Sequence, residues 1–419
     1  MTASRVVARI VSTFLISLLA ATSCAEAVVG PGDPGDPGDP GTPQVPSGNP
    51  TLVLSSVHAG NFFSCGLSVA GNAYCWGLNQ NKQLGSAEVV DFTNRPRLAV
   101  RFGSQFPLFR KLAGSVNHAC GITLADQMMC WGVGSGSFGT ATPTIVTFTN
   151  ASRILDVSVG GGHTCALEYG GWVICMGDNQ RGQLGIGTGE EQEDELVPVD
   201  SGATRFSAVA AGGVHSCGVE QGTQSIRCWG DGFLGQIGDG VNFPTAISIS
   251  IAGTFNPNSL VAGENHSCAL NNAGAAFCWG ANGSGQLGDG TTTQRNIPTA
   301  VSGGLVFASL YAGEDHTCGV TAAGVAHCWG RNNAGQLGDG TQVDRSAPAA
   351  VVGGFTYNSL GLGSLHSCGV ASTAGGAGTI ATGGTVYCWG DSEYGQAGTG
   401  VFRANNLPFL TPTKVANQP

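Results

Sequence analysis

His266-Ser267-Cys268, Cys278-Trp279-Gly280 and Gly285-Gln286-Leu287-Gly288 follow one another within one short stretch of the chain. The first two motifs return fifty positions further on as His316-Thr317-Cys318 and Cys328-Trp329-Gly330. Between the motifs, apolar residues alternate with polar or small ones, and glycine-rich turns interrupt these runs. Alternation of this kind predicts short antiparallel strands. The stretch therefore predicts one multi-stranded unit of a repeated all-β fold.

The same frame fits the chain seven times, and its two cysteines account for fourteen of the fifteen cysteines. The pairs are Cys65 with Cys75, Cys120 with Cys130, Cys165 with Cys175, Cys217 with Cys228, Cys268 with Cys278, Cys318 with Cys328, and Cys368 with Cys388. A period of about 50 residues with about four short strands is typical of one propeller blade. We therefore predict an all-β, seven-bladed β-propeller over residues 51–419, with about four antiparallel strands per blade. A solenoid is the alternative, but it would need polar caps at its ends, and the sequence has none.

The two ends of the chain are predicted to meet in one blade. Most repeats open with a Pro-x-x-Val or Pro-x-x-Ile pattern, as at Pro143, Pro298 and Pro348. The first repeat has no room for this strand upstream of Cys65, whereas Pro412-Thr413-Lys414-Val415 supplies a further copy at the far end. We therefore expect the ring to be closed by the C-terminal strand joining the N-terminal blade, which removes an open sheet edge.

The combination of His-x-Cys, Cys-Trp-Gly and Gly-Gln-Leu-Gly-Asp-Gly resembles the regulator of chromosome condensation repeat. The resemblance covers about residues 51–415 and implies a seven-bladed propeller. The family includes a nuclear exchange factor for a small GTPase, bacterial β-lactamase inhibitor proteins and many secreted proteins, and a shared fold does not select among these functions. Paired cysteines in every blade depart from the nuclear members. The sequence is therefore more similar to secreted bacterial members, and in fold to the propeller-type β-lactamase inhibitor proteins.

Each cysteine pair flanks a predicted hairpin, so the two cysteines of a pair should lie opposite each other. Opposed strand residues have Cα atoms about 4.5–5.5 Å apart, within disulfide range. Zinc is the alternative ligand, but structural zinc sites usually use cysteines two to four residues apart, a spacing that is absent here. We therefore predict seven local disulfides, which form in oxidising compartments.

Residues 1–23 have the features of an export signal. Arg5 and Arg9 precede an apolar run, Ile10 to Ala21, that is too short to span a bilayer. Residues 24–50 are rich in Pro, Gly and Asp, which predicts a solvated and partly extended spacer. The chain is thus expected to leave the cytoplasm and to hold its propeller away from any anchor.

Two processing sites compete at the end of the export signal. Ala21-Thr22-Ser23-Cys24 resembles a bacterial lipoprotein box, which would lipidate Cys24, and Ala25-Glu26-Ala27 resembles an ordinary cleavage site, which would discard it. We expect a lipoprotein of the bacterial outer membrane or cell surface, with secretion as the alternative.

The formal net charge is −10, and only 11% of the residues are charged. Binding to nucleic acid needs clustered Lys and Arg, so nucleic acid is excluded as a partner. No motif indicates a cofactor or a metal. We expect a monomer that binds a protein partner and that meets a membrane only through a lipid anchor at Cys24.

Two repeated side chains are predicted to pack the ring. Six repeats have a histidine two residues before the first cysteine, and Phe63 takes its place in the first repeat. Catalytic groups must converge, whereas repetition spreads these residues around a ring, so we expect buried imidazoles bonded to backbone. The repeated tryptophan should pack between blades. Met176 takes its place in the third repeat, where the role of the nearby Trp172 stays open.

Recognition should depend on positions at which the repeats differ. The loops after the Gly-Gln-Leu-Gly turns differ most, and variable loops on rigid strands commonly carry binding sites. An insertion from Ala371 to Gly384 lengthens the seventh hairpin, and its role is open. The candidate partner-binding residues are Glu88, Asp91 and Arg95 in the first of these loops, and Glu190, Glu191, Glu193, Asp194 and Glu195 in an acidic run of the third.

We therefore predict a non-catalytic recognition module, extracellular or displayed at the surface. Clustered acids at Glu264, Glu314 and Asp315 suggest an alternative, because paired carboxylates are the groups that glycosidases use. An exported carbohydrate-active hydrolase or lyase would need these side chains to converge in one pocket near the propeller channel.

Overall fold

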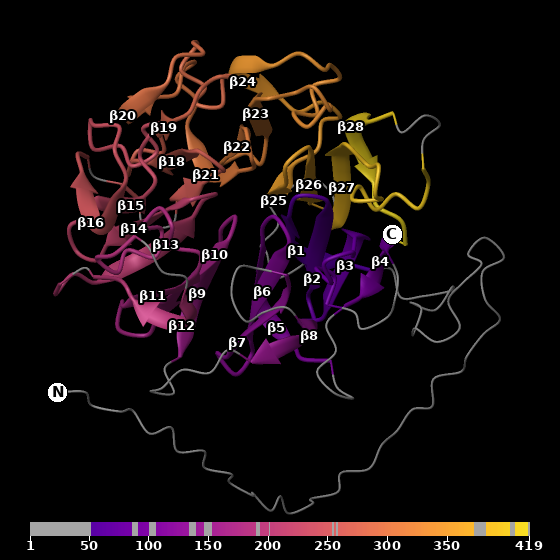
Figure 1. Cartoon of the computed structure of the whole chain (residues 1–419). Coiled ribbons are helices and arrows are strands. Elements are labelled where there is room, and N and C mark those ends of the chain that lie inside the picture. The colour runs from indigo at the N-terminus through magenta and orange to yellow at the C-terminus, as the bar shows by residue number, and fades with distance from the viewer. Residues whose placement is uncertain are drawn as a thin grey trace, which may run out of the picture.

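The structure is a computed structural model that describes residues 52–417 apart from 86–90, 100–105, 134–139, 146–152, 190–192, 201, 254, 257–258, 373–382 and 403–406. The described chain forms seven four-stranded antiparallel sheets that stand around one axis as the blades of a β-propeller (Figure 1). The prediction of seven blades of four antiparallel strands is confirmed. The export signal, the spacer and Cys24 lie outside the described residues.

Each blade is contiguous in sequence, and its strands run in order from the channel to the rim. The strands of blades one to four are β1 (Leu54–Ala59), β2 (Phe63–Ser68), β3 (Ala73–Leu78), β4 (Phe92–Leu98); β5 (Phe109–Gly114), β6 (His118–Thr123), β7 (Met128–Gly132), β8 (Thr140–Ile145); β9 (Ile154–Val159), β10 (His163–Glu168), β11 (Val173–Gly177), β12 (Glu193–Pro198); and β13 (Phe206–Ala211), β14 (His215–Glu220), β15 (Ile226–Gly230), β16 (Thr245–Ile251). Those of blades five to seven are β17 (Val261–Ala262), β18 (His266–Leu270), β19 (Ala276–Gly280), β20 (Arg295–Ala300); β21 (Phe307–Ala312), β22 (His316–Thr321), β23 (Ala326–Gly330), β24 (Arg345–Ala350); and β25 (Tyr357–Leu362), β26 (His366–Ala371), β27 (Thr385–Gly390), β28 (Phe409–Lys414).

The two middle strands of every blade place its two cysteines opposite each other. In the fifth blade Cys268 pairs with Cys278 in the strand register, and their Cα atoms are 4.1 Å apart. Seven disulfides join the predicted pairs, one in each blade. The prediction of local disulfides is confirmed, and disulfides of this number indicate an oxidising compartment.

Ring closure differs from the prediction. Strand β28 pairs with β27 of the seventh blade, and β4 completes the first blade, so no strand is exchanged between the two ends of the chain. The Pro-x-x-Val pattern lies in the fourth and outermost strand of a blade, whereas the prediction placed it in the first strand. The prediction was wrong because β1 fits upstream of Cys65 without that motif. The ends still meet, since the Leu52 N–H donates a hydrogen bond to the Asn417 carbonyl at 3.2 Å.

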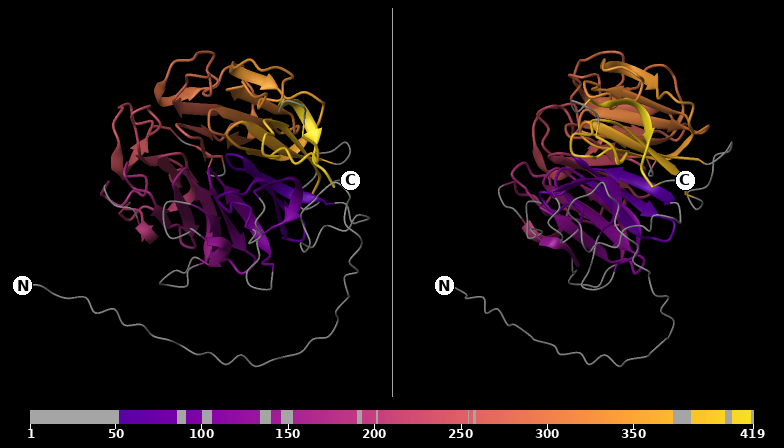
Figure 2. Two further views of the ribbon diagram at one scale, coloured as in Figure 1. Left: turned by 45° about the vertical axis from the view of Figure 1, so that its right-hand side comes forward. Right: turned by 90° about the vertical axis from the view of Figure 1, so that its right-hand side faces the viewer.

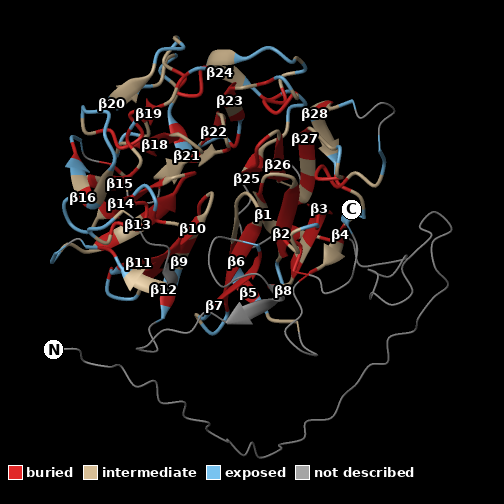
Figure 3. Ribbon diagram, viewed as in Figure 1, coloured by how far each residue is buried: buried red, intermediate tan, exposed pale blue. Residues whose placement is uncertain are grey.

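The hydrophobic core is divided among the seven seams, the contact surfaces between adjacent blades. Each seam holds a cluster of buried apolar side chains from both blades, and the seam between the seventh and first blades has its own cluster, which includes Leu54, Trp76 and Val370. Figure 3 shows the buried residues on the inner strands and the exposed ones toward the rim, and Figure 2 shows the ring from two further sides. None of the described segments forms an apolar helix of membrane-spanning length.

Candidate functional site

The repeated histidines bond across the blade seams. In the sixth blade the Nε2 atom of His316 lies 2.9 Å from the Ser367 hydroxyl of the seventh blade, and the same contact closes the ring between His366 and Ser64 at 2.7 Å. The other pairs are His118 with Thr164, His163 with Ser216, His215 with Ser267, and His266 with Thr317. The prediction of buried imidazoles is confirmed, but their partners are side-chain hydroxyls of the next blade, not backbone groups.

The hydroxyl also determines the histidine tautomer. The Ser367 hydroxyl donates its single proton to the Gln336 carbonyl at 2.8 Å, so it can only accept from the Nε2–H of His316. Burial lowers the pKa of the six ring histidines to between about 3 and about 4. The ring therefore holds six neutral imidazoles at physiological pH.

The repeated tryptophans bond across the same seams in the opposite direction. The indole of Trp329 in the sixth blade is fully buried and donates from Nε1 to the Gln286 carbonyl of the fifth blade at 3.0 Å. Gly288, in the same turn as Gln286, has a φ of +69°, and a Cβ there would lie 2.7 Å from the indole nitrogen. The Gly-Gln-Leu-Gly turn therefore contacts and hydrogen-bonds the tryptophan of the next blade. The prediction that the repeated tryptophan packs between blades is confirmed.

Met176 fills the tryptophan position of the third blade and is buried. Trp172 does not take over that position. Its side chain is 37% exposed, and the guanidinium carbon of Arg205 lies 3.1 Å from the centre of its ring. The question that the sequence left open is thus settled, because Trp172 belongs to the surface at the hairpin ends of the blades.

The seam between the first and second blades lacks both members of the histidine pair. Phe63 stands where the other blades have histidine, and Ala119 stands where the next blade would supply the hydroxyl. Both side chains are buried, so this seam replaces a polar contact with an apolar one. The two substitutions go together because a histidine alone would leave a buried N–H without an acceptor, whereas in the other seams the hydroxyl has a carbonyl of the preceding blade as a second partner, as Ser367 has Gln336.

This pairing makes a prediction for a double-mutant cycle. Phe63→His alone should destabilise the protein, because its Nε2–H would be buried without an acceptor, at a cost of about 1–3 kcal/mol in addition to lost packing. Adding Ala119→Ser should recover part of that loss, with a favourable coupling energy of about 1 kcal/mol or more. Denaturant titration of the four proteins measures the coupling, and strictly additive effects would contradict the pairing.

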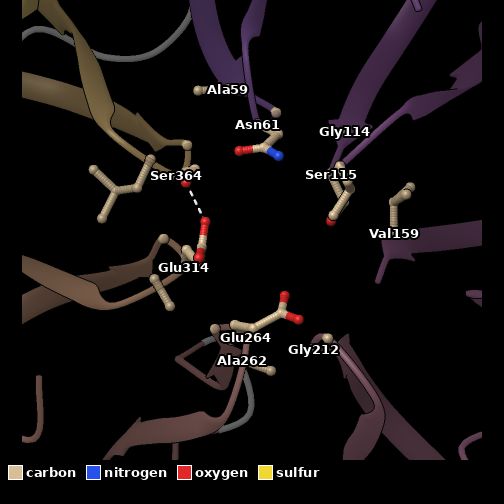
Figure 4. Close-up of a pocket in the computed structure, with 18 of the residues that line it drawn as sticks. Ala59, Asn61, Gly114, Ser115, Val159, Gly212, Ala262, Glu264, Glu314 and Ser364 are labelled. Carbon is tan, nitrogen blue, oxygen red and sulfur yellow. Dashed lines mark hydrogen bonds between the residues drawn. The ribbon is translucent and has the colours of Figure 1, made fainter. Parts of the chain in front are cut away.

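A small cavity of about 90 Å³ lies on the propeller axis and is lined by residues from all seven blades. Glu264 and Glu314 point into it, and the Ser364 hydroxyl donates a hydrogen bond to the Glu314 carboxylate (Figure 4). Burial, together with the negative charges of Glu314 and Asp315, raises the pKa of Glu264. Two of the three predicted acids thus converge.

Asp315 lies outside this cavity lining. Its carboxylate accepts a hydrogen bond from the Gln286 amide at 3.0 Å and lies 3.6 Å from the Arg331 guanidinium. Ligand pockets commonly enclose about 300–1,000 Å³, several times the volume of the axial cavity. Over the described ranges, no three His, Cys, Asp or Glu side chains gather in a way that could hold a metal ion.

Exposed apolar side chains stand at the start of strand β4 in the first blade and between strands β27 and β28 in the seventh. Phe92 and Phe402, which are 43% and 47% exposed, make an edge-to-face contact with ring centres 5.7 Å apart. Val401 and Leu407 are exposed nearby in sequence. We call these four residues the rim cluster. The sequence reasoning missed it, although apolar residues in otherwise polar loops were the available signal.

The structure places two of the predicted partner-binding residues beside the rim cluster. Asp91 is exposed and immediately precedes Phe92, and the guanidinium of Arg95 lies beside Gly400 of the seventh blade. Glu88 lies outside the described residues. Asp91 and Arg95 therefore stand at the seam that joins the two ends of the chain.

The acidic run lies differently from the prediction. Glu193, Asp194 and Glu195 begin strand β12, in which Glu193 pairs with Gly177, so half of the run is an outer strand and not a loop. Strand pairing with β11 outweighs the low strand propensity of these acids. Glu190 and Glu191 lie outside the described residues.

The insertion in the seventh hairpin has described residues only at its two ends. Ala371 ends strand β26, and Gly384 forms an antiparallel bridge with Leu54 of the first blade. The C-terminal end of the insertion therefore takes part in closing the ring. Residues 373–382 lie outside the described residues.

The repeated His, Trp and Gly-Gln-Leu-Gly residues all join adjacent blades. This arrangement places the chain in a class of seven-bladed propellers built from one sequence repeat. Two forms of the regulator of chromosome condensation (RCC1) repeat match the chain, one at residues 171–219, 273–320 and 323–358 and the other at residues 55–83, 154–183, 258–286 and 307–336. The chain therefore contains repeats of the regulator of chromosome condensation type.

Curated relatives match about half of the chain. The ultraviolet-B receptor UVR8 of Arabidopsis thaliana is 28% identical over 207 residues, which cover 47% of this chain and 46% of the receptor. The probable E3 ubiquitin-protein ligase HERC4 of Homo sapiens is 31% identical over 208 residues, which cover 48% of this chain and 20% of the ligase. The chain thus spans less than half the length of each of these relatives.

Solved structures share the fold at low sequence identity. Human WBSCR16 superposes with a TM-score of 0.68 at 19% identity, covering 77% of this chain and 88% of that one. Prp20p from Saccharomyces cerevisiae, described with its binding to Gsp1p and histones, superposes with a TM-score of 0.67 at 20% identity, covering 76% and 82%. These likenesses establish the propeller fold.

Proposed function

We propose that this protein is a non-catalytic recognition module that works outside the cytoplasm and binds a protein partner. The observation that carries the proposal is that repeated and non-repeated residues have different places in the structure. The repeated polar side chains form hydrogen bonds between blades, whereas exposed aromatic and charged side chains stand at positions that differ from blade to blade. Variable loops on a rigid scaffold are a usual arrangement for recognition.

The rim cluster, with Asp91 and Arg95 beside it, is the proposed centre of the binding surface. Exposed aromatic residues next to an arginine are typical of the side chains that contribute most to protein interfaces. The related propeller Prp20p is described as binding Gsp1p and histones, so this fold can present a protein-binding face. The same use of the fold is proposed here, with a partner of different identity.

The acidic run Glu190–Glu195 is proposed to steer a cationic partner toward this face. Steering by exposed charges speeds association and weakens with salt, because the screening length is only about 8 Å near physiological ionic strength. The overall negative charge of the chain acts in the same direction.

The proposed location is the outside of the cell envelope. Seven disulfides favour an oxidising compartment. Lipidation of Cys24, followed by the Pro-rich spacer of residues 24–50, would hold the propeller at a distance from the membrane. Release after cleavage beyond Cys24 is the alternative.

A carbohydrate-active hydrolase or lyase is the second candidate, because Glu264 and Glu314 do converge on the axis. The small cavity weighs against it, since about 90 Å³ leaves no room for a sugar ring with its neighbours. Loss of activity on a polysaccharide in Glu264→Gln and Glu314→Gln variants would favour this candidate.

Affinity capture from the native envelope, followed by binding kinetics, tests the proposal. Phe92→Ala and Phe402→Ala should each weaken binding of the captured partner about tenfold or more, as expected for central aromatic residues. Tyr169→Ala is the matched control, because this aromatic residue is 68% exposed at the hairpin end of the third blade. Weakening by Tyr169→Ala alone would move the binding surface to the opposite face of the ring.

The acidic run has a separate kinetic test. Exchanging Glu for Gln and Asp for Asn throughout Glu190–Glu195 should slow association several-fold at low salt, with little change at high salt. An on-rate that does not depend on these charges would remove the steering role.

A further inference from the structure

The outer strand of each blade is an open sheet edge, and six of the seven are protected. Strands β4, β8, β12, β20, β24 and β28 each contain a proline, and all but β8 also carry charged residues. Proline and charge on an edge strand prevent pairing with another chain. Strand β16, with the sequence Thr-Ala-Ile-Ser-Ile-Ser-Ile, has neither.

The missing proline can be located by register. Ser248 precedes the residue that pairs with the second cysteine, and in five other blades a proline occupies that place: Pro96, Pro143, Pro298, Pro348 and Pro412. Proline is tolerated at edge strands and at bulges, and this place lies in the bulge between the residues that pair with Cys228 and Gly230. The ladder with β15 therefore does not need the Ser248 N–H, which leaves it as a donor for an added strand.

The surroundings of β16 leave part of this edge accessible, at Ile247 and Ser250. Among the described strands, β16 pairs with β15 alone, and it lies at the rim of the ring (Figure 1). Ile247 is 51% exposed, and the buried Ser248 hydroxyl has no hydrogen-bond partner. Two contacts do reach the strand: the Gly187 N–H donates to the Ala246 carbonyl, and the Arg227 guanidinium donates to the Ser248 carbonyl, which keeps a second lone pair.

The sequence of β16 indicates which strand would pair with its open edge. The segment Ala246-Ile247-Ser248-Ile249-Ser250-Ile251-Ala252 reads the same in both directions around Ile249. Antiparallel pairing of two copies about a two-fold axis at Ile249 would place Ile247 opposite Ile251 and Ser248 opposite Ser250. The side chains free to contact the second copy are those of Ile247, Ile249 and Ser250, because Ser248 and Ile251 are buried within their own blade. Two-fold dimers of this kind are the commonest assemblies.

We propose that β16 is a dimerisation edge at which two copies of this chain pair antiparallel to form one continuous eight-stranded sheet across two blades. The strand itself carries no charged residue, and the Arg227 guanidinium that reaches its Ser248 carbonyl is paired with Glu220. Each chain carries a net charge of −10, so association should strengthen as salt screens the overall repulsion. The monomer expected from the sequence is then the form present at low concentration. The dimer uses the fourth blade, away from the rim cluster, and is independent of the proposed function.

The test uses the full mature chain with its disulfides formed, followed by sedimentation or light scattering over a concentration series. The wild-type protein should dimerise. Ser248→Pro should raise the dissociation constant at least about tenfold, because it removes an outward donor while placing a residue that five other blades accept. Unchanged melting temperature and tryptophan fluorescence would show that the fold is retained.

A charge exchange on the axis gives the sharper result. Ile249→Lys and Ile249→Glu should each remain monomeric, because residue 249 faces its own copy, and an equimolar mixture of the two should form the dimer. Thr299→Lys is the matched control, since Thr299 holds the same register in β20 of the next blade and should leave the dimer intact. A wild-type chain that stays monomeric overturns the proposal. A wild-type dimer that survives Ser248→Pro, or a mixture that fails to pair, also overturns it.

Discussion

Lowering the pH from 7 to 4 should destabilise the ring steeply, because six buried histidines are neutral in the folded protein. The unfolded chain protonates each histidine near its ordinary pKa of 6.5, whereas the folded ring resists protonation until about pH 4 for His118 and His266 and about pH 3 for the other four. Between these values the unfolded state binds more protons, so the free energy of unfolding falls as the pH falls. Above about pH 7 this contribution is constant.

The expected size of the effect is large. Each histidine lowers the free energy of unfolding by about 1.4 kcal/mol per pH unit once the unfolded chain is protonated, so the six ring histidines reach about 8 kcal/mol per unit. His58, whose pKa burial and the Lys111 charge lower to about 4, adds to the slope in the same direction. That slope is comparable to the whole stability of an ordinary domain. Glu264 and Asp315 act in the opposite direction, because their raised pKa values make the folded state bind protons first, but they are only two groups.

Urea titrations at pH 7, 6 and 5, followed by tryptophan fluorescence with the disulfides intact, measure this slope. The variant His316→Gln is the control, because its amide can still donate to Ser367 but does not titrate in this range. This variant should reduce the slope of the unfolding free energy against pH by the contribution of one proton, about 1.4 kcal/mol per pH unit. A free energy of unfolding that is unchanged between pH 7 and pH 5 would refute the account.

Reduction of the seven disulfides should unfold the propeller at equilibrium. Each bond closes a short loop, which by the chain-entropy model contributes about 2–3 kcal/mol, so the seven together exceed the stability of a typical domain. All fourteen cysteines are buried, and therefore reduction should be slow without denaturant and fast with it. A reduced protein that keeps its cooperative transition at the original urea concentration would contradict this expectation.

Loop length provides an internal comparison. Cys368 and Cys388 are separated by 20 residues, whereas Cys268 and Cys278 are separated by 10. Replacing both cysteines of the longer pair by alanine should cost about 0.6 kcal/mol more than the same change in the shorter pair, because loop-closure entropy grows with the logarithm of length. Both double variants lose the same atoms from buried sites. The difference between their losses in unfolding free energy therefore reports the effect of loop length. Equal losses would argue against chain entropy as its source.

Blade number, strand order within a blade and cysteine pairing could all be predicted from the sequence because each depends on neighbours close along the chain. Cys268 and Cys278 meet across one hairpin, so alternation and a central glycine turn suffice to place them. The same repeat frame carries that prediction to every blade. The loops around Asp91 and Arg95 could likewise be selected as variable positions, but not the Phe92–Phe402 contact beside them, which joins the first and seventh blades.

Only the tertiary structure decided how the blades join. Ser64 bonds to His366, some 300 residues away, and no local pattern indicates which hydroxyl a buried imidazole will reach. Ring closure was mispredicted for the same reason, since the Pro-x-x-Val pattern marks an outer strand without showing to which blade that strand belongs. The convergence of Glu264 and Glu314 also required the closed ring. Periodicity specifies the repeated unit, whereas contacts between units depend on how all seven pack around one axis.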